Sequence, residues 1–204
     1  MGDLSDDEIQ HYRYIHTLGN GIREPRWRGV RVVKFPEDLI LYAQVIWKRR
    51  PDFIVETGTR FGGSALFFGD MLQLIGGKKV FTIDVSHECH PPPHPMVEHV
   101  LGSSIDPAIV ERIRSEVSDG KVMVVLDSDH STKHVLAELR AYQDIVTPGQ
   151  YIVVEDCWTR HKTPYEPWHA VEEFLKENPA FKRFNLEKQF IYAVTKDGWL
   201  RRQR

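Results

Sequence analysis

The stretch that decides the fold is KVMVVLDSDHSTKHVLAELRAY, residues 121–142. It begins with an uninterrupted apolar run, which is typical of a strand buried on both faces of a sheet. After Ser131 it continues with apolar residues at helical spacing, and Ser131 is in position to cap that helix. Between strand and helix stand Asp127, Asp129 and His130, which are more ionisable side chains than a structural turn needs.

Strand and helix alternate in the same way over most of the chain. Strong strand signals are the apolar, β-branched segments at 52–58, 79–85, 121–127 and 150–156, and weaker signals lie near 98–103, 181–187 and 190–200. Helical spacing of apolar residues covers 37–49, 63–75, 107–117, 131–145 and 167–178. This alternation predicts an α/β protein with a doubly wound, mostly parallel sheet. Only a short connection separates the last two strand candidates, which favours an antiparallel hairpin at the C-terminal edge of the sheet.

The size and composition fit one globular domain. The chain has 204 residues, of which 41% are apolar and 27% charged, and its net charge is −2. We therefore expect a single domain over residues 1–204, with residues 1–36 as an N-terminal extension that caps the core. The lack of a basic excess argues against nucleic acid or an anionic membrane as a partner. Two cysteines, an acidic N-terminus and no long apolar run favour a cytoplasmic protein.

The polar residues at the strand ends point to a ligand, because ligands of open parallel sheets bind beyond the carboxyl ends of the strands. The first strong strand leads into Gly58, Gly62 and Gly63, whose spacing is neither that of a dinucleotide-binding turn nor that of a phosphate loop. Glu56 before this turn favours a ligand with a cationic portion, and Asp84 at the second strand end can accept hydrogen bonds from ribose hydroxyls. Together these residues suggest a positively charged nucleoside without a pyrophosphate, a description that S-adenosylmethionine fits.

Three segments carry a resemblance to a known family. They are ETGTRFGGSALFF at 56–68, IDVS at 83–86 and DSDHSTKHVLAELRAYQDIVTPGQYIVVED at 127–156. In them the chain resembles the cephalosporin hydroxylase family, which has the Rossmann-like fold of class I S-adenosylmethionine-dependent methyltransferases. It is also similar to macrolide-sugar and rhamnosyl O-methyltransferases. The resemblance covers roughly residues 35–158 and implies a seven-stranded methyltransferase sheet.

The resemblance also implies which residues hold the cofactor, S-adenosylmethionine. They are Glu56, Gly58, Arg60 and Ser64 around the methionine portion, Asp84 at the ribose, and Ser103, Ser104 and Asp127 at the adenine or the loop beside it. Most of these residues follow the strand ends described above, so the resemblance and the residue pattern agree on the place of the ligand.

The resemblance further implies a Mg²⁺ ion beside the cofactor, held by carboxylates at the ends of two neighbouring strands. Glu155 and Asp156 follow one of these strands, and either Asp127 or Asp129 serves from the other, since the spacing does not separate the two. Adjacent strand ends lie about 5 Å apart, so carboxylates from both can reach one ion, and Mg²⁺ prefers such oxygen ligands. His130 is then expected to be the base that takes the proton of the acceptor hydroxyl. The related catechol O-methyltransferases have a lysine at this place, and the sugar methyltransferases share the histidine.

Two further stretches are expected to cover the site. HECHPPPHP, residues 87–95, contains histidines and a cysteine, but their spacing fits no common zinc pattern, and its three prolines favour a stiff loop over the ligand. Trp158, His161 and Tyr165 follow the fifth strand and could cover the other side. His134, one helical turn after His130, is expected to be structural.

The residue pattern together with the family resemblance predicts a Mg²⁺-dependent S-adenosylmethionine O-methyltransferase that acts on a hydroxyl group of a small molecule, such as a sugar moiety or a natural product. One alternative is a hydroxylase or oxygenase component of secondary metabolism, although an iron site of that kind usually has two histidines and one carboxylate. Another is a partner subunit that binds the cofactor without turnover. The sequence does not identify the substrate, and it leaves a homo-oligomer open.

Overall fold

The computed structural model describes residues 25–86, 92–157, 166–190 and 193–204. Within these ranges a seven-stranded sheet is built from β3 (Phe53–Thr57), β4 (Lys79–Asp84), β5 (Val97–Leu101), β6 (Val122–Leu126), β7 (Tyr151–Val154), β8 (Phe181–Arg183) and β9 (Trp199–Arg202). The strand order is β5-β4-β3-β6-β7-β9-β8, and β9 runs antiparallel to both of its neighbours while the other pairings are parallel. The predicted α/β class and the mostly parallel sheet are thereby confirmed.

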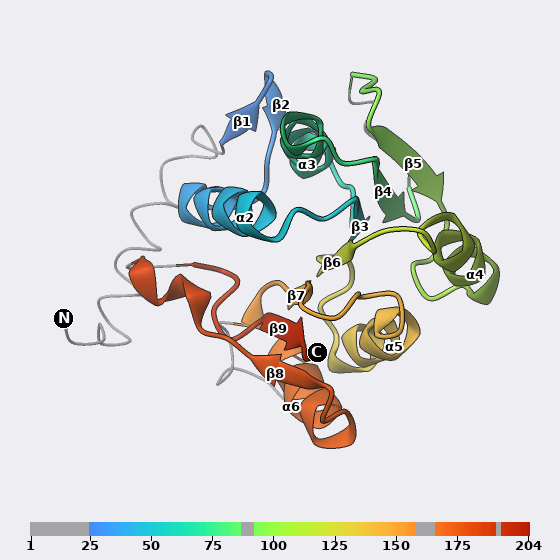
Figure 1. Cartoon of the computed structure of the whole chain (residues 1–204), viewed down its shortest axis with the longest axis vertical. Helices are drawn as coiled ribbons and strands as arrows, with labels where there is room; N and C mark the ends of the chain where they lie inside the picture. The colour runs from blue at the N-terminus through green and yellow to red at the C-terminus, as the bar shows by residue number, and fades with distance from the viewer. Residues whose placement is uncertain (1–24, 87–91, 158–165, 191–192) are drawn as a thin grey trace.

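Helices cover both faces of this sheet (Figure 1). One face carries α2 (Pro36–Arg49) and α3 (Gly63–Ile75), and the other carries α4 (Pro107–Glu116), α5 (Thr132–Tyr142) and α6 (Pro167–Glu177). Strand β6 shows why its sequence has no polar interruption: Met123 and Val125 belong to the core under α2 and α3, whereas Val122, Val124 and Leu126 belong to the core on the opposite face. Each residue of such a strand faces one core or the other, so each must be apolar.

The C-terminal edge differs from the prediction in its connection. Strands β8 and β9 do pair antiparallel, but residues 184–198 separate them, and these include the 3₁₀ helix η2 (Leu186–Gln189). Much of the predicted strand at 190–200 is therefore not a strand. Its buried residues are held instead by Asp38 at the start of α2, which accepts hydrogen bonds from the backbone amides of Val194 and Thr195.

The sheet changes winding direction between β3 and β6, which is where ligands bind in open α/β sheets. The loops after these two strands lie in direct contact. Gly58 has a φ of 86°, and a Cβ atom built on it would lie 1.9 Å from the carbonyl oxygen of Asp127. The glycine is therefore needed for the contact between the two loops as well as for its own conformation.

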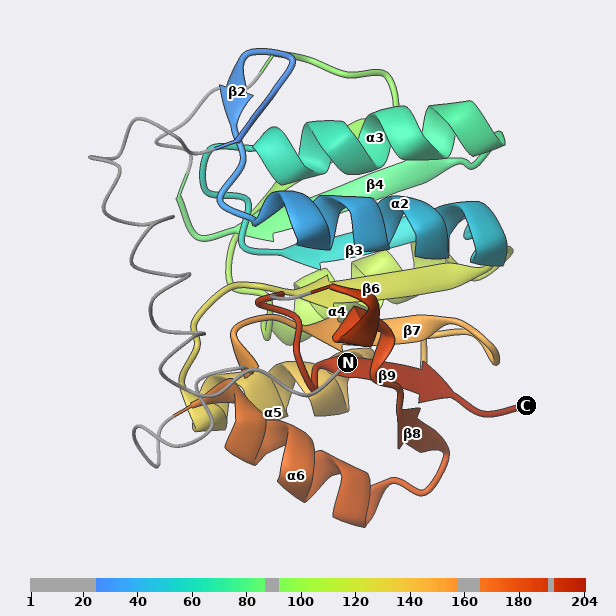
Figure 2. The same ribbon diagram turned by 90° about the vertical axis from the view of Figure 1, so that its left-hand side faces the viewer.

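A short hairpin formed by β1 (Arg26–Trp27) and β2 (Val30–Arg31) precedes α2 and lies over α3 (Figure 2). The indole of Trp27 donates a hydrogen bond to Asp70 at 2.7 Å and packs edge-on against the ring of Phe67. The part of the predicted N-terminal extension that the structure describes thus packs on the core. Residues 1–24 of that extension lie outside the described residues.

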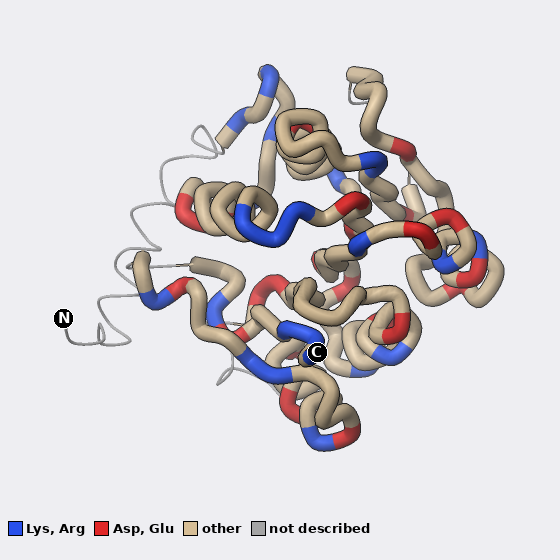
Figure 3. The backbone as a smooth tube through the Cα atoms, in the orientation of Figure 1, with Lys and Arg blue, Asp and Glu red and all other residues tan. Residues whose placement is uncertain are grey.

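Acidic and basic residues are interspersed along the described elements (Figure 3). Several of them pair at the surface, for example Arg112 with Glu116 and Arg140 with Glu177. Exposed pairs of this kind contribute at most about 1 kcal/mol each to stability. Among the described helices, none has the length and the apolar composition needed to cross a membrane.

Candidate active site

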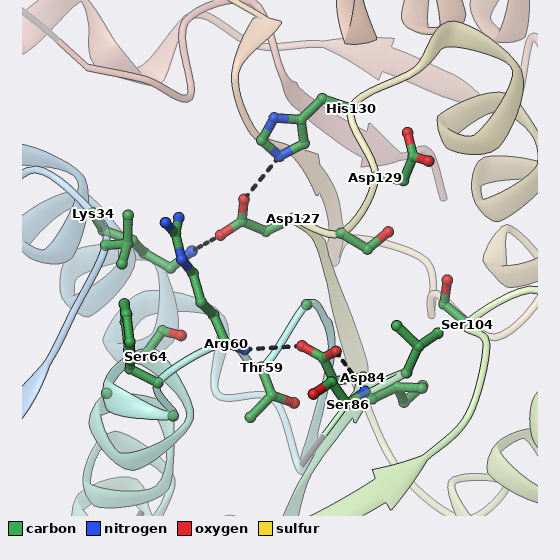
Figure 4. A pocket seen from close by; sticks show the side chains of 18 of the residues that line it. Lys34, Thr59, Arg60, Ser64, Asp84, Ser86, Ser104, Asp127, Asp129 and His130 are labelled. Carbon is green, nitrogen blue, oxygen red and sulfur yellow. Dashed lines mark hydrogen bonds and ion pairs between the residues drawn. The ribbon is translucent and has the colours of Figure 1, made fainter. Parts of the chain in front are cut away.

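A cavity of about 880 Å³ lies beyond the carboxyl ends of β3, β4, β5 and β6 (Figure 4). The N-terminal segment closes one side of it with Arg31, Val33 and Lys34. Among the site residues predicted from the sequence, those that line the cavity are Gly58, Arg60, Ser64, Asp84, Ser103, Ser104, Asp127, Asp129, His130 and Asp156. Glu56 and Glu155 are not among the lining residues.

The Asp84 carboxylate, at the end of β4, holds the loop that follows β3. Its Oδ2 accepts a hydrogen bond from the Arg60 amide at 2.9 Å, and its Oδ1 accepts one from the Ser86 amide at 3.0 Å (Figure 4). Arg60 has a φ of 45°, a left-handed conformation that is uncommon for residues other than glycine. Each carboxylate oxygen can accept a further hydrogen bond, so Asp84 keeps the capacity to bind ribose hydroxyls.

Glu56 lies beneath the floor of the cavity. Its side chain is fully buried, and its Oε2 accepts a hydrogen bond from the Thr82 hydroxyl at 2.7 Å. Burial raises the pKa of Glu56 to about 7, although the Lys34 ammonium and a hydrogen bond from Ser64 oppose the shift. Ser64 lines the cavity, whereas Glu56 does not.

The raised pKa of Glu56 predicts a pH-dependent stability difference between the wild type and Glu56→Gln. Because the folded protein holds this proton between the ordinary pKa of 4.5 and about 7, the free energy of unfolding of the wild type falls relative to that of the variant as the pH rises through this range. The expected change is up to about 3 kcal/mol. Urea unfolding of both proteins at pH 5 and pH 7.5 measures it, and a difference that is the same at both pH values would show that Glu56 titrates normally.

A second polar network borders the cavity beside the ends of β5 and β6. The Ser104 hydroxyl lies 3.1 Å from His134 Nε2, and the same nitrogen lies 3.5 Å from Glu138 Oε1. The Ser128 hydroxyl donates to that Glu138 oxygen at 2.6 Å, and the hydrogen bond to Glu138 raises the pKa of His134. Although His134 was expected to be only structural, it lines the cavity next to Ser103 and Ser104 and fixes the hydroxyl of the latter.

Three side chains that follow β6 and β7 form the group best suited to a divalent cation. One ligand atom each from Asp127, His130 and Asp156 lies within 4.8 Å of the others. The imidazole bridges the two acids, with Nε2 at 3.3 Å from Asp127 Oδ1 and Nδ1 at 3.2 Å from Asp156 Oδ2. The hydrogen bond to Asp127 raises the pKa of His130 to about 9, so in this arrangement the imidazole is protonated at neutral pH. Asp156 has a φ of 56°, a strained conformation of the kind found at functional sites, which costs about 1–3 kcal/mol.

The structure places the other two predicted metal ligands differently. Asp129 lines the cavity, but its Oδ1 accepts a hydrogen bond from the Ser131 amide at 2.7 Å and so fixes the turn before α5. The strand ends before either aspartate of this stretch, so their spacing of two does not put both on one face. Glu155 is 2% exposed, and its Oε1 accepts hydrogen bonds from Lys34 at 2.6 Å and from the Tyr42 hydroxyl at 2.7 Å.

Lys34 is the residue at this site that the sequence reasoning missed. Its ammonium binds Asp127 Oδ2 at 2.7 Å and Glu155 Oε1 at 2.6 Å, and its side chain is 1% exposed. Burial lowers the pKa of Lys34, but the two carboxylates raise it by more, so the net shift is upward and the side chain stays charged. The signal in the sequence was a single lysine inside the apolar segment VVKF, since lysine is rarely buried without a partner.

The predicted iron-oxygenase alternative finds little support in this geometry. Within the described part of the chain, the cation-binding group holds one histidine and two carboxylates, the reverse of the two-histidine, one-carboxylate set of such enzymes. Carboxylate oxygens favour a hard cation such as Mg²⁺.

Several residues predicted to cover the site lie outside the described residues. They are positions 87–91 of the proline-rich stretch together with Trp158, His161 and Tyr165. His94, from the same proline-rich stretch, is described and buried, with its Nε2 3.0 Å from Asp70 Oδ1. It thus joins the contacts that hold the N-terminal hairpin on α3.

Comparison with known proteins shows the family to which the chain belongs. A family model described as rhamnosyl O-methyltransferase/CmcI matches residues 21–203. A rhamnosyl O-methyltransferase of Mycobacterium leprae (strain TN) is 34% identical over 189 residues, which cover 87% of this chain and 82% of that protein. A rhamnosyl O-methyltransferase of Mycobacterium tuberculosis (strain ATCC 25618 / H37Rv) is 34% identical over 184 residues, which cover 85% of this chain and 73% of that protein.

Two solved structures share the fold. An apo-structure of CmcI-N160 superimposes with a TM-score of 0.72 and 23% sequence identity, and it covers 100% of this chain and 86% of its own. A structure of CmcI-D160 with Mg and SAM gives a TM-score of 0.68 and 22% identity, with coverage of 100% and 87%. At these identities the likeness concerns the arrangement of strands and helices.

Proposed function

The chain belongs to the rhamnosyl O-methyltransferase/CmcI family and is an S-adenosylmethionine-dependent O-methyltransferase, and from this premise we propose that it acts with Mg²⁺ on a hydroxyl group of a sugar moiety or natural product. The observation that carries the proposal is the group formed by Asp127, His130 and Asp156 at the edge of the cavity. It puts two carboxylates and one imidazole beside the space for a cofactor.

The donor set suits the proposed ion. Mg²⁺ takes oxygen ligands and keeps several positions for water or substrate, and Asp127 and Asp156 supply two carboxylates without filling its coordination sphere. When bound, the ion supplies positive charge that lowers the pKa of the acceptor hydroxyl and disfavours a proton on the neighbouring imidazole. Because Mg²⁺ seldom binds imidazole, we assign His130 to proton transfer and not to the ion.

The chain's own residues then position the reaction. Asp84 and the loop after β3, which contains Arg60, hold the nucleoside, while Ser64 contacts the methionine portion. His130 accepts the hydroxyl proton at Nε2 as the substrate oxygen bonds to the methyl carbon and the carbon–sulfur bond gives its electron pair to sulfur. Such a displacement depends mainly on holding the reacting atoms in line.

Sugar recognition rests on the relatives and on the size of the site. The two mycobacterial proteins described above are rhamnosyl O-methyltransferases, and both alignments cover most of this chain. The cavity is of the size that binds a small molecule together with part of a cofactor. A rhamnoside with free hydroxyls is therefore the first acceptor to test.

We expect methyl transfer to a rhamnoside to stop when EDTA removes divalent cations and to return when Mg²⁺ is added in excess. Mass spectrometry with methyl-deuterated S-adenosylmethionine measures the transferred group directly. Calorimetric binding of S-adenosylhomocysteine in EDTA serves as a control that the fold and the cofactor site remain intact. Transfer that continues unchanged in EDTA would contradict the metal requirement.

A further inference from the structure

Lys34 joins the N-terminal segment to both acids of the neighbouring strand ends. It lies between β2 and α2, and its ammonium contacts Asp127 across 93 positions of sequence and Glu155 across 121. Lys34 lines the cavity, and Figure 4 shows its ammonium directed at Asp127. Its side chain is almost fully buried. A contact of this kind fixes both partners, since a buried ion pair has few alternative arrangements.

The two carboxylate oxygens of Asp127 have different partners. Lys34 binds Oδ2 at 2.7 Å, while Oδ1 faces His130 Nε2 at 3.3 Å. The lysine therefore fixes the rotation of this carboxylate, and Oδ1 remains directed to the side where Asp156 also lies. Within the described residues, Oδ2 has no hydrogen-bond partner other than this ammonium.

Glu155 in turn holds the ammonium of Lys34 in place. Glu155 Oε1 accepts its hydrogen bond and also accepts one from the Tyr42 hydroxyl at 2.7 Å. Tyr42 is fully buried and packs against the rings of Phe68 and Trp199. The support thus runs from the aromatic core under α2 and α3 through Glu155 to the ammonium, and from there to Asp127.

We propose that Lys34 is a positioning residue for the divalent cation: it holds Asp127 so that Oδ1 is presented to the ion together with Asp156. This inference rests on the proposed function, because it assumes that the cation binds at this group. It makes the N-terminal segment part of the metal site. Partners that orient metal ligands in this way typically contribute about 10- to 100-fold to metal affinity.

A different role for Lys34 would give the opposite result, which makes the inference testable. If the ammonium acted mainly as a competing positive charge, its removal would tighten cation binding, because opposite charges attract and like charges repel at short range. A positioning role predicts weaker binding despite the loss of that charge. The sign of the change in affinity therefore decides between the two roles.

The experiment is a Mn²⁺ titration followed by electron paramagnetic resonance, with Mn²⁺ as the probe for the Mg²⁺ site. We expect Lys34→Met to weaken Mn²⁺ binding about 10- to 100-fold and Lys34→Arg to weaken it less, since arginine keeps the charge but changes the donor geometry. Lys78→Met is the matched control, because Lys78 pairs with Asp119 at the surface and should leave the affinity unchanged. Calorimetric binding of S-adenosylhomocysteine, unchanged within about twofold, identifies variants that keep the fold and the cofactor site.

Equal or tighter Mn²⁺ binding by Lys34→Met would overturn the inference while leaving the proposed metal site intact. If Lys34→Met fails to bind S-adenosylhomocysteine, Lys34→Arg decides alone, and wild-type Mn²⁺ affinity in that variant would overturn the inference. A wild-type protein that does not bind Mn²⁺ would overturn both this inference and the metal dependence on which it rests.

Discussion

Replacing His130 with glutamine is expected to lower kcat for methyl transfer by about 100- to 10,000-fold, the range that a positioned general base contributes. Glutamine keeps a hydrogen-bonding side chain near Asp127 and Asp156 but cannot accept a proton at neutral pH. Steady-state kinetics with a rhamnoside acceptor measures the effect. The KM for S-adenosylmethionine should change little, because His130 borders the cavity on the side of the two acids.

The Mg²⁺ dependence of His130→Gln separates a base from a metal ligand. If His130 is the base, the Mg²⁺ concentration for half-maximal activity stays near that of the wild type. An increase of about tenfold or more would instead make His130 a ligand of the ion, consistent with the loss of a metal-binding group. His134→Gln is the matched control: it lines the same cavity but contacts Ser104 and Glu138, so it should affect cofactor binding more than kcat. A kcat in His130→Gln equal to that of the wild type would show that His130 is not the general base.

Replacing Gly58 with alanine is expected to lower the free energy of unfolding by about 3 kcal/mol or more. The new Cβ would lie 1.9 Å from the carbonyl oxygen of Asp127, a backbone atom that cannot move without shifting the loop after β6. The positive φ of 86° adds strain of about 1 kcal/mol for any residue with a side chain. Because the shifted loop carries Asp127 and His130, the surviving folded protein should also bind Mn²⁺ more weakly.

Gly149→Ala is the control that separates the steric overlap of a new Cβ atom from the strain of a positive φ. Gly149 has a nearly equal φ of 89°, but a Cβ built on it meets nothing within 4 Å. The free energy of unfolding of this variant should therefore fall only by the amount due to strain, about 1 kcal/mol. Urea unfolding of both variants measures the difference, and equal losses in the two would show that the contact between Gly58 and Asp127 does not constrain the loops.

The alternation of strands and helices was predictable because each buried parallel strand needs an uninterrupted apolar run, which β6 shows most clearly. The end of the chain was harder to predict. Val194 and Thr195 are buried like strand residues, but their amides donate hydrogen bonds to the Asp38 carboxylate, more than 150 positions earlier, and not to a neighbouring strand. A local apolar pattern cannot reveal that partner, so the segment was mistaken for a strand.

Part of the candidate site was also predictable from the sequence. The strand ends and the family resemblance located Asp84, Asp127, His130 and Asp156 at one cavity, because carboxyl ends of parallel strands meet at one edge. Lys34 was missed because its role depends on contacts with residues far along the chain. The different placements of Asp127 and Asp129 arise from the end of β6 and the turn before α5, which spacing alone does not define.

The central claim is that Asp127 and Asp156 hold a divalent cation beside the cofactor, with His130 next to it. A crystal of the protein with S-adenosylhomocysteine and Mn²⁺, measured at a wavelength where manganese scatters anomalously, tests this most directly. We predict an anomalous peak within coordination distance of both carboxylates and in contact with the cofactor cavity. A cofactor bound in the cavity without such a peak, or with the manganese held elsewhere, would contradict the claim.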